Sequence, residues 1–209
     1  MSRRAYDNSA RQIAARATRA RILAAAYELL VSTGYASLSI ADLARAAQVS
    51  PQTIYNAIGG KAEVLKACYD VTLAGDDESV AMSDRPEFKA MFTSESAGDY
   101  LERYARWCRV IGQRVEPIIG AFIRPGSADS GVAAFLATIE GERRTGTTHA
   151  MTRLRDVHGL RPGLALSRAV DIAWTLNSPE VYDRLVNRCG WSAAAYERWL
   201  AGQLKAGLL

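Results

Sequence analysis

The chain has 209 residues, of which 49% are hydrophobic and 23% charged, an ordinary composition for a globular protein. No apolar run approaches the ~20 residues of a membrane-spanning helix, and no secretory signal pattern opens the chain. Cys68, Cys108 and Cys189 lie far apart without a Cys/His cluster, which argues against a zinc site or a disulfide framework. We therefore expect a cytoplasmic protein with reduced thiols and no contact with a membrane.

The net charge of +4 is unevenly distributed. Residues 1–66 hold nine Lys/Arg and four Asp/Glu, a balance of +5, so residues 67–209 carry −1. A basic segment followed by a near-neutral remainder is typical of a nucleic-acid-binding module joined to a domain with another task.

Residues 1–12 carry three arginines against the single Asp7 and show no apolar period. We expect a flexible basic arm, which either enters a minor groove of DNA or is a solvated tail without a role. From about residue 9 to residue 32 the apolar spacing predicts a helix. Thr33-Gly34 is expected to end that helix, since glycine is the usual residue just past a helix end.

Two short helices are predicted next, within about residues 39–58. Ser39 precedes the first and Asp42 stands three positions later, which is a capping-box pattern. Ser50 and Pro51 open the second, as the N-cap and the first helical residue. Two short helices joined by a tight turn predict a helix-turn-helix.

The second of these helices exposes side chains suited to DNA. If Ile54, Ala57 and Ile58 face inward, then Gln52, Tyr55 and Asn56 lie outside, with Thr53 at the border. Gln and Asn can pair with adenine edges and the Thr methyl suits the thymine methyl. We expect Gln52, Thr53 and Asn56 to contact bases. The alternative is a generic three-helix unit whose polar residues are only solvated.

Phosphate contacts are assigned to three further side chains. Gly59-Gly60 ends the second helix, and Lys61 begins the next, where a cation and free backbone N–H groups can hold one phosphate. The Tyr55 hydroxyl can reach another phosphate, and Ser39 completes the set.

Several of these residues form a family motif. The segments Thr33-Gly34-Tyr35, Leu38–Ala44, Val49-Ser50, Thr53-Ile54-Tyr55 and Lys61–Leu65 resemble the N-terminal domain of the TetR family of transcriptional regulators. The resemblance is close over about residues 15–70. The chain departs from the family in having Ile58 where Phe is usual, a residue other than Gly before Val49, and Gly60 where Ser or Asn is common.

The rest of the chain also predicts helices, and no strand alternation appears. Residues 76–95 are expected to be a loop with at most one short helix. Helices are predicted at 98–114, in a short run from Pro117, at 129–158, from Pro162, after Ser178 and after Ser192. The fold class is thus all-α, with a helix-turn-helix domain at 13–75 and a larger helical domain at 76–209.

The family resemblance implies that this larger domain dimerises and binds a small-molecule effector. Residues 163–177 and 192–206 fit two dimer helices, with Ala169, Ala173, Trp174, Trp199 and Leu200 as interface candidates. Candidate pocket residues are Tyr104, Trp107, Phe122 and Met151. For both sets the alternative is ordinary core.

Other functions are less well supported by the sequence. No Gly-rich phosphate loop, GxSxG or HExxH motif occurs, so we expect no enzyme, no catalytic residues and no cofactor. His149 and His158 lack a ligand pattern and are not expected to bind metal. An architectural DNA-binding protein without an effector is the main alternative.

We expect a transcriptional regulator, a repressor that binds palindromic double-stranded DNA as a homodimer and is released by an effector.

Overall fold

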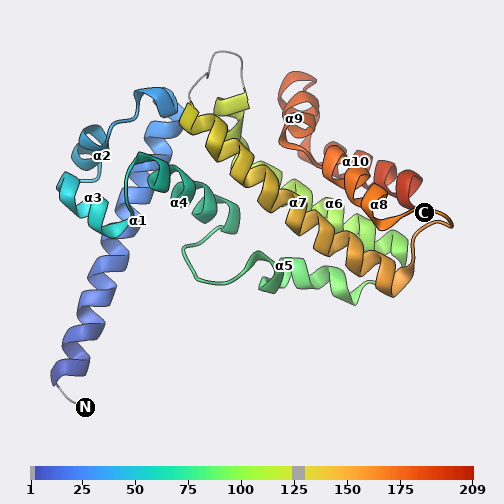
Figure 1. The fold of residues 1–209 in the computed structure, drawn as a ribbon, viewed down its shortest axis with the longest axis horizontal. Helices are drawn as coiled ribbons and strands as arrows, with labels where there is room; N and C mark the ends of the chain where they lie inside the picture. Colours follow the sequence, from blue (N-terminus) through green and yellow to red (C-terminus); the bar gives the residue numbers. More distant parts are fainter. Residues whose placement is uncertain (1–2, 124–129) are drawn as a thin grey trace. The chain divides into compact units, whose positions relative to one another are not determined.

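The computed structural model describes residues 3–123 and 130–209, and these form helices and connecting loops without a strand. Two compact units are present. The first comprises the residues up to Asp77 together with the segment that ends at Phe135, and the second comprises Glu78–Ile123 and Leu136–Leu209. Figure 1 labels their helices. The all-α prediction is confirmed for the described residues.

The first unit is a small helical domain. It contains α1 (Arg3–Ser37), α2 (Ile40–Ala46), α3 (Pro51–Ala57), α4 (Lys61–Ala74) and the beginning of α7 (Ser130–His158). Its core combines apolar side chains of every one of these helices, because each helix turns one apolar face inward. The buried members include Ile22, Leu23, Ala26, Leu30, Leu43, Ile54, Val64, Leu65, Cys68, Tyr69, Val132 and Phe135.

Helix α1 differs from the prediction at its start. The helix begins at Arg3, whereas the sequence predicted a flexible arm over 1–12; residues 1 and 2 lie outside the described part. Ala, Arg and Gln are strong helix formers and no Gly or Pro interrupts 3–12, so local propensity extends the helix without an apolar stripe. The predicted stop is confirmed, since Gly34 has φ 78° and ψ 166° and kinks the chain.

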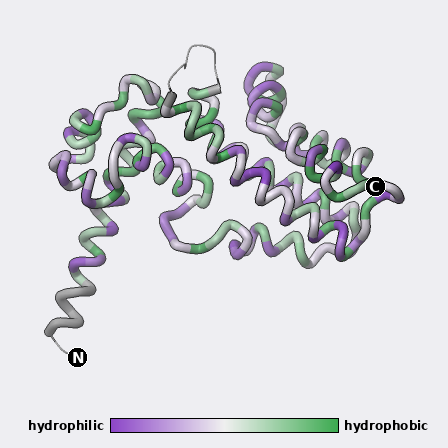
Figure 2. Tube along the Cα trace, viewed as in Figure 1, coloured by the Kyte–Doolittle hydropathy of each residue, from purple (hydrophilic) through white to green (hydrophobic). Residues whose placement is uncertain are grey.

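The second unit is a larger helical domain. Figure 2 shows hydrophobic and hydrophilic residues alternating along its long helices, as expected of helices that bury one face. Its core includes Tyr100, Leu101, Tyr104, Met151, Leu154, Ala169, Ala173, Tyr182, Tyr196, Leu200 and Leu204. Its elements, besides the rest of α7, are η1 (Met82–Asp84), α5 (Pro86–Lys89), η2 (Ala90–Thr93), α6 (Ala97–Ile123), α8 (Leu166–Leu176), α9 (Pro179–Tyr182), the π-helical η3 (Asp183–Arg188) and α10 (Ala193–Leu208).

Two helix boundaries in this unit correct the sequence prediction. Helix α6 continues through Pro117 instead of restarting there. The buried side chains of Val115, Ile118 and Ile119 on both sides of the proline hold the helix together, so packing outweighs the lost backbone hydrogen bond. Helix α8 begins at Leu166 and not at Pro162, because Gly163 takes φ +81° and delays the start.

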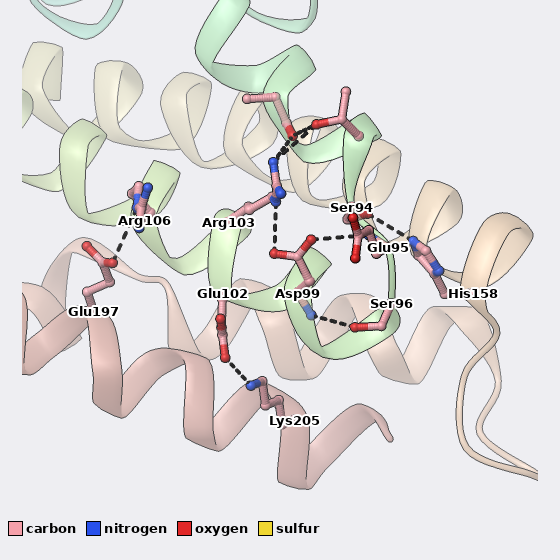
Figure 3. Close-up of polar contacts among 12 residues, drawn as sticks. Ser94, Glu95, Ser96, Asp99, Glu102, Arg103, Arg106, His158, Glu197 and Lys205 are labelled. Carbon is pink, nitrogen blue, oxygen red and sulfur yellow. Dashed lines mark hydrogen bonds and ion pairs between the residues drawn. The ribbon is translucent and has the colours of Figure 1, made fainter.

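Polar contacts fix the beginning of α6 (Figure 3). The Ser96 hydroxyl accepts a hydrogen bond from the Asp99 backbone N–H at 3.1 Å, as an N-cap does. Asp99 in turn accepts from the Arg103 Nε at 2.9 Å, and this hydrogen bond holds the pKa of the Asp99 carboxyl below its usual value. Arg103 also donates to the Ala90 carbonyl at 3.0 Å, which ties α6 to η2.

The same figure shows how α6 is joined to its neighbours. Ser94 hydrogen-bonds the Nε2 of His158, at the end of α7, at 2.9 Å. Lys205 of α10 pairs with Glu102 of α6 at 2.5 Å. The Lys205–Glu102 ion pair is exposed and therefore contributes little to stability, so the apolar core carries most of the packing between α6 and α10.

One close approach in this unit depends on a glycine. A Cβ built on Gly112 of α6 would lie 2.8 Å from the ring of Tyr182, at the end of α9. The Tyr182 ring also stacks edge-on against Tyr196 of α10, with centroids 4.9 Å apart. Gly112 therefore lets α6 contact α9 more closely than any other residue would.

Candidate nucleic-acid interface

The first helix of the predicted helix-turn-helix is capped as the sequence indicates. The Ser39 hydroxyl accepts from the Asp42 backbone N–H at 3.0 Å and donates to the Asp42 carboxylate at 2.6 Å. This hydrogen bond from Ser39 lowers the pKa of the Asp42 carboxyl, and Arg45, 3.0 Å away, adds to the effect. Helix α2 thus begins with a negative charge at its positive end.

The turn between the two helices has a strained residue. Gln48 has φ 54°, in the left-handed region that glycine favours. The Val49 N–H donates to the Ala44 carbonyl at 3.0 Å and the Gln48 N–H to the Arg45 carbonyl at 3.2 Å. These are the two hydrogen bonds of a Schellman motif, which satisfies the last carbonyls of α2.

The second helix, α3, is capped by Ser50. Its hydroxyl accepts from the Thr53 N–H at 3.1 Å and hydrogen-bonds the Thr53 hydroxyl at 2.8 Å. Pro51 occupies the first turn, and Ile54 is fully buried beneath the helix. The orientation of α3 within the first unit is therefore fixed by its buried side and by its cap.

The opposite side of α3 is exposed and carries the predicted base contacts. Gln52 and Asn56 are exposed, Thr53 is half-buried, and Tyr55 is 53% exposed. The Gln52 Nε2 donates to the Asn56 Oδ1 at 2.9 Å. Each amide keeps a further N–H hydrogen and a further oxygen lone pair for a base edge. This contact therefore orients both side chains and leaves them able to hydrogen-bond to DNA.

Of the predicted phosphate contacts, Tyr55 lies on this exposed face, Ser39 caps α2, and Lys61 stands at the start of α4. Lys61 begins α4, with its ammonium 4.1 Å from the Tyr35 ring centroid and 3.4 Å from the Ala36 carbonyl oxygen. Gly60, at the N-cap, provides no side-chain hydrogen bond, in agreement with the departure from the family pattern. Gly59 has φ 131°, and a Cβ there would lie 2.9 Å from the Glu63 side chain. No side chain at the N-cap of α4 therefore competes with a phosphate for the backbone N–H groups near Lys61.

The predicted effector-pocket residues lie in the second unit. Tyr104, Phe122 and Met151 are buried, and Trp107 is half-buried. The Tyr104 hydroxyl accepts from the Asn177 Nδ2 at 2.7 Å. Burial raises the pKa of Tyr104 well above its ordinary value, so its hydroxyl stays protonated.

A polar cluster surrounds that hydroxyl. The Tyr104 hydroxyl donates to the Thr147 hydroxyl at 3.4 Å, and the Arg143 guanidinium donates to the Asn177 side-chain oxygen at 2.7 Å. Arg143 also donates to the Trp174 carbonyl at 3.2 Å, near the end of α8. Sequence reasoning missed Thr147 and Asn177, because neither differs in pattern from an exposed polar residue.

The predicted dimer residues separate into two groups. Ala169, Ala173 and Leu200 are fully buried in the core of the single chain, which favours the alternative of ordinary core for these three residues. Small apolar residues at helical spacing suit a helix–helix contact inside one chain as well as one between two chains. Trp174 and Trp199 remain half-buried.

Trp199 borders an apolar groove that the sequence did not predict. The groove has a volume of about 400 Å³ and is lined by Leu176, Glu180, Val181, Arg184, Leu185 and Trp199. The apolar residues come from α8, α9, η3 and α10 and are only half-buried in the single chain. The sequence did not indicate the groove, since exposure cannot be read from the apolar spacing of a short helix alone.

The described residues contain no cluster of His, Cys, Asp and Glu that could hold a metal ion. Within the same residues no helix has the length and apolar character needed to cross a bilayer. All three cysteines carry free thiols, with Cys68 buried and Cys189 exposed.

Comparison with known proteins identifies the first unit. Residues 22–68 match the model of the bacterial regulatory proteins of the tetR family. This span contains the capped helices α2 and α3 and the N-terminal half of α4. No curated protein matches the chain in sequence.

Several solved structures are similar over nearly the whole chain. A protein of Syntrophomonas wolfei described as a TetR-family transcriptional regulator has 13% identity and a TM-score of 0.71, over 91% of this chain and 94% of that one. A second, from Rhodococcus sp., has 16% identity and a TM-score of 0.69, over 92% and 98%.

NalD of Pseudomonas aeruginosa, the secondary repressor of the MexAB-OprM multidrug efflux pump, has 17% identity and a TM-score of 0.68, over 93% of this chain and 98% of its own. At these identities the likeness concerns the fold. The chain thus has a helix-turn-helix segment that matches the tetR-family model, joined to a larger helical domain, and its fold is that of the solved structures described as TetR-family transcriptional regulators.

Proposed function

We propose that this protein is a sequence-specific transcriptional regulator, a repressor that binds a palindromic operator as a homodimer and leaves it when an effector binds. The single observation that carries the proposal is the exposed face of α3. Gln52 and Asn56 stand on a helix that is fixed by its cap and its buried side, and no acidic residue lies on that helix. Such a surface suits the edge of a base pair.

Two observations support a homodimer: the small size of the DNA-contacting helix α3 and the apolar groove in the second unit. A seven-residue helix contacts only a few base pairs, and a two-fold dimer on a palindrome doubles the site. The groove beside Trp199 offers apolar area to a second copy, and Glu180 and Arg184 on its border can pair across a two-fold axis. We place the interface there rather than at Ala169, Ala173 and Leu200.

The repressor and effector roles rest on the larger domain. NalD, which shares the fold, is a repressor. We place the effector beside the half-buried Trp107. The buried side chains of Tyr104, Phe122 and Met151 would offer it apolar and aromatic surface once the helices part, and the nearby polar cluster offers Thr147 and Asn177 for its orientation. An effector that prefers one arrangement of the domain would shift the population away from the DNA-binding state.

The test is selection of bound duplexes from a random library by the purified protein. We expect a palindromic consensus from the wild type, and a relaxed one from Gln52→Ala and Asn56→Ala. Gln203→Ala is the matched control, since Gln203 is an exposed helical glutamine of α10 in the second unit. Each base-contact substitution should cost ~1–3 kcal/mol on the consensus.

Two outcomes would contradict the proposal. Enrichment of no sequence by the wild type at low salt would reject a sequence-specific regulator. Binding that spreads evenly along any duplex would instead indicate an architectural protein, for which affinity depends on charge alone.

A further inference from the structure

The N-terminal part of α1 extends beyond the body of the first unit (Figure 1). Every side chain from Ala10 to Ala17 is exposed, and Ile22 is the first buried residue of the helix among the side chains that the structure describes. The apolar core therefore does not cover residues 10–17, which belong to the segment here called the arm helix (residues 3–21 of α1). Most helical stability in proteins comes from the packing of an apolar face, which residues 10–17 lack, so a binding partner would stabilise this segment.

The arm helix has a fixed position relative to α3. The Arg19 guanidinium donates to the Ala57 carbonyl, at the end of α3, at 3.4 Å, and pairs with Asp77 at 2.8 Å. From this point the helix continues at about 1.5 Å per residue, which places Arg16 about 5 Å and Arg11 about 12 Å further along the axis. Arg16 also shares the face of Arg19, since it lies three residues before it.

The charge of the arm helix indicates the kind of partner. Arg11, Arg16 and Arg21 are exposed, and none of them has an ion pair within the described part of the chain. The sequence adds Arg3 and Arg4 against the single Asp7. Ile13 is the one large apolar residue in 10–21, so the segment lacks the apolar face that a lipid surface or a protein groove requires. A polyanion fits it best.

We propose that the arm helix binds phosphates of the DNA that flanks the half-site contacted by α3. The proposal rests on the DNA-binding function proposed above. A helix that leaves the end of α3 and continues for about 24 Å (roughly 16 residues at 1.5 Å each) extends about twice the ~12 Å width of the major groove. This length is sufficient for the arm helix to reach phosphates beyond the groove that α3 would occupy.

The experiment measures affinity against salt concentration on two duplexes. One duplex contains the selected palindrome alone, and the other adds about one helical turn, ~10 base pairs, on each side. The variant is Arg11→Gln/Arg16→Gln, which keeps helix-forming residues. Arg161→Gln/Arg168→Gln is the matched control, with two exposed arginines removed from the second unit.

On the flanked duplex, we expect the slope of log K against log salt to become shallower by about 0.9 per lost phosphate contact, or about 1.8 per protomer, in the arm variant. On the palindrome alone the arm variant and the wild type should have the same slope, and both should select the same consensus. Arg11→Lys/Arg16→Lys should restore the wild-type slope, because lysine supplies the same charge.

Failure of this proposal is distinguishable from failure of the proposed function. A wild-type protein that selects a palindrome, together with an arm variant whose slopes equal those of the wild type on both duplexes, would overturn the role of the arm helix and leave the regulator intact. A wild-type protein that selects no sequence would overturn both. An equal loss in the Arg161→Gln/Arg168→Gln control would show that the effect is one of net charge and would also reject the arm helix.

Discussion

Replacement of Gln48 by glycine should stabilise the helix-turn-helix. Gln48 is exposed and holds φ 54°, and its contribution to the turn is the backbone hydrogen bond that any residue can make. An L-residue in this region costs about 1–2 kcal/mol relative to glycine. Glycine also lowers the stability of the folded state by about 0.5–1 kcal/mol, because it gives the unfolded chain more conformational freedom. The net gain expected for Gln48→Gly is therefore between about 0 and 1.5 kcal/mol, with a midpoint of about 0.75 kcal/mol.

Urea or thermal unfolding at fixed protein concentration measures this gain. For a chain of this length, 1 kcal/mol corresponds to about 2–4 °C in Tm. Gln203→Gly is the matched control, since Gln203 is an exposed residue inside α10, where glycine should cost about 0.5–1 kcal/mol. Gln48→Ala should leave stability nearly unchanged, because alanine keeps the strain. A Gln48→Gly protein destabilised as much as Gln203→Gly would refute the strain argument.

Three further predictions concern the interface, the groove and the α2 cap. Lys61→Ala should weaken binding to all sequences alike and lower the salt slope by about one, whereas Lys66→Ala on the same helix should not; a loss limited to the consensus duplex would contradict a phosphate role. Val181→Asp, in the groove, should shift sedimentation towards the monomer, while Val157→Asp, at an exposed position on α7, should not; dimers that persist in the groove variant would place the interface elsewhere. Asp42→Asn should lower stability at neutral pH. Because the folded-state pKa of Asp42 is lowered, its contribution is present above the ordinary carboxyl pKa of about 4 and is lost as the pH falls through the folded value. The wild type and the variant should therefore converge in acid, and a constant gap across the pH range would argue against the cap.

The helix-turn-helix could be predicted from sequence because its signals are local. Ser39 and Ser50 cap the helices that follow them, and Ile54 lies on the buried side, as their spacing predicted. Capping depends on residues three positions apart, so the chain itself carries the information. The strain at Gln48 was indicated only by the family's preference for glycine there.

Elements that depend on distant contacts could not be predicted in the same way. Pro117 stands within α6 because the buried residues around it hold the helix, and neither the proline nor its neighbours in sequence reveal those partners. Ala169 and Ala173 are buried in the chain's own core for the same reason. An apolar face predicts that something covers it, and only the tertiary structure tells whether the cover belongs to the same chain.

The contact between Gly112 and Tyr182 has a consequence for the outer surface of the second unit. Tyr182 directly follows Val181, a wall of the apolar groove, and its ring rests on the bare backbone of α6. Any side chain at position 112 would push the ring, and with it α9, outward. The position of α9, and with it the shape of the groove that a second copy would contact, thus depends on α6. A substitution at Gly112, which is not part of the groove lining, would therefore change which partner the groove accepts.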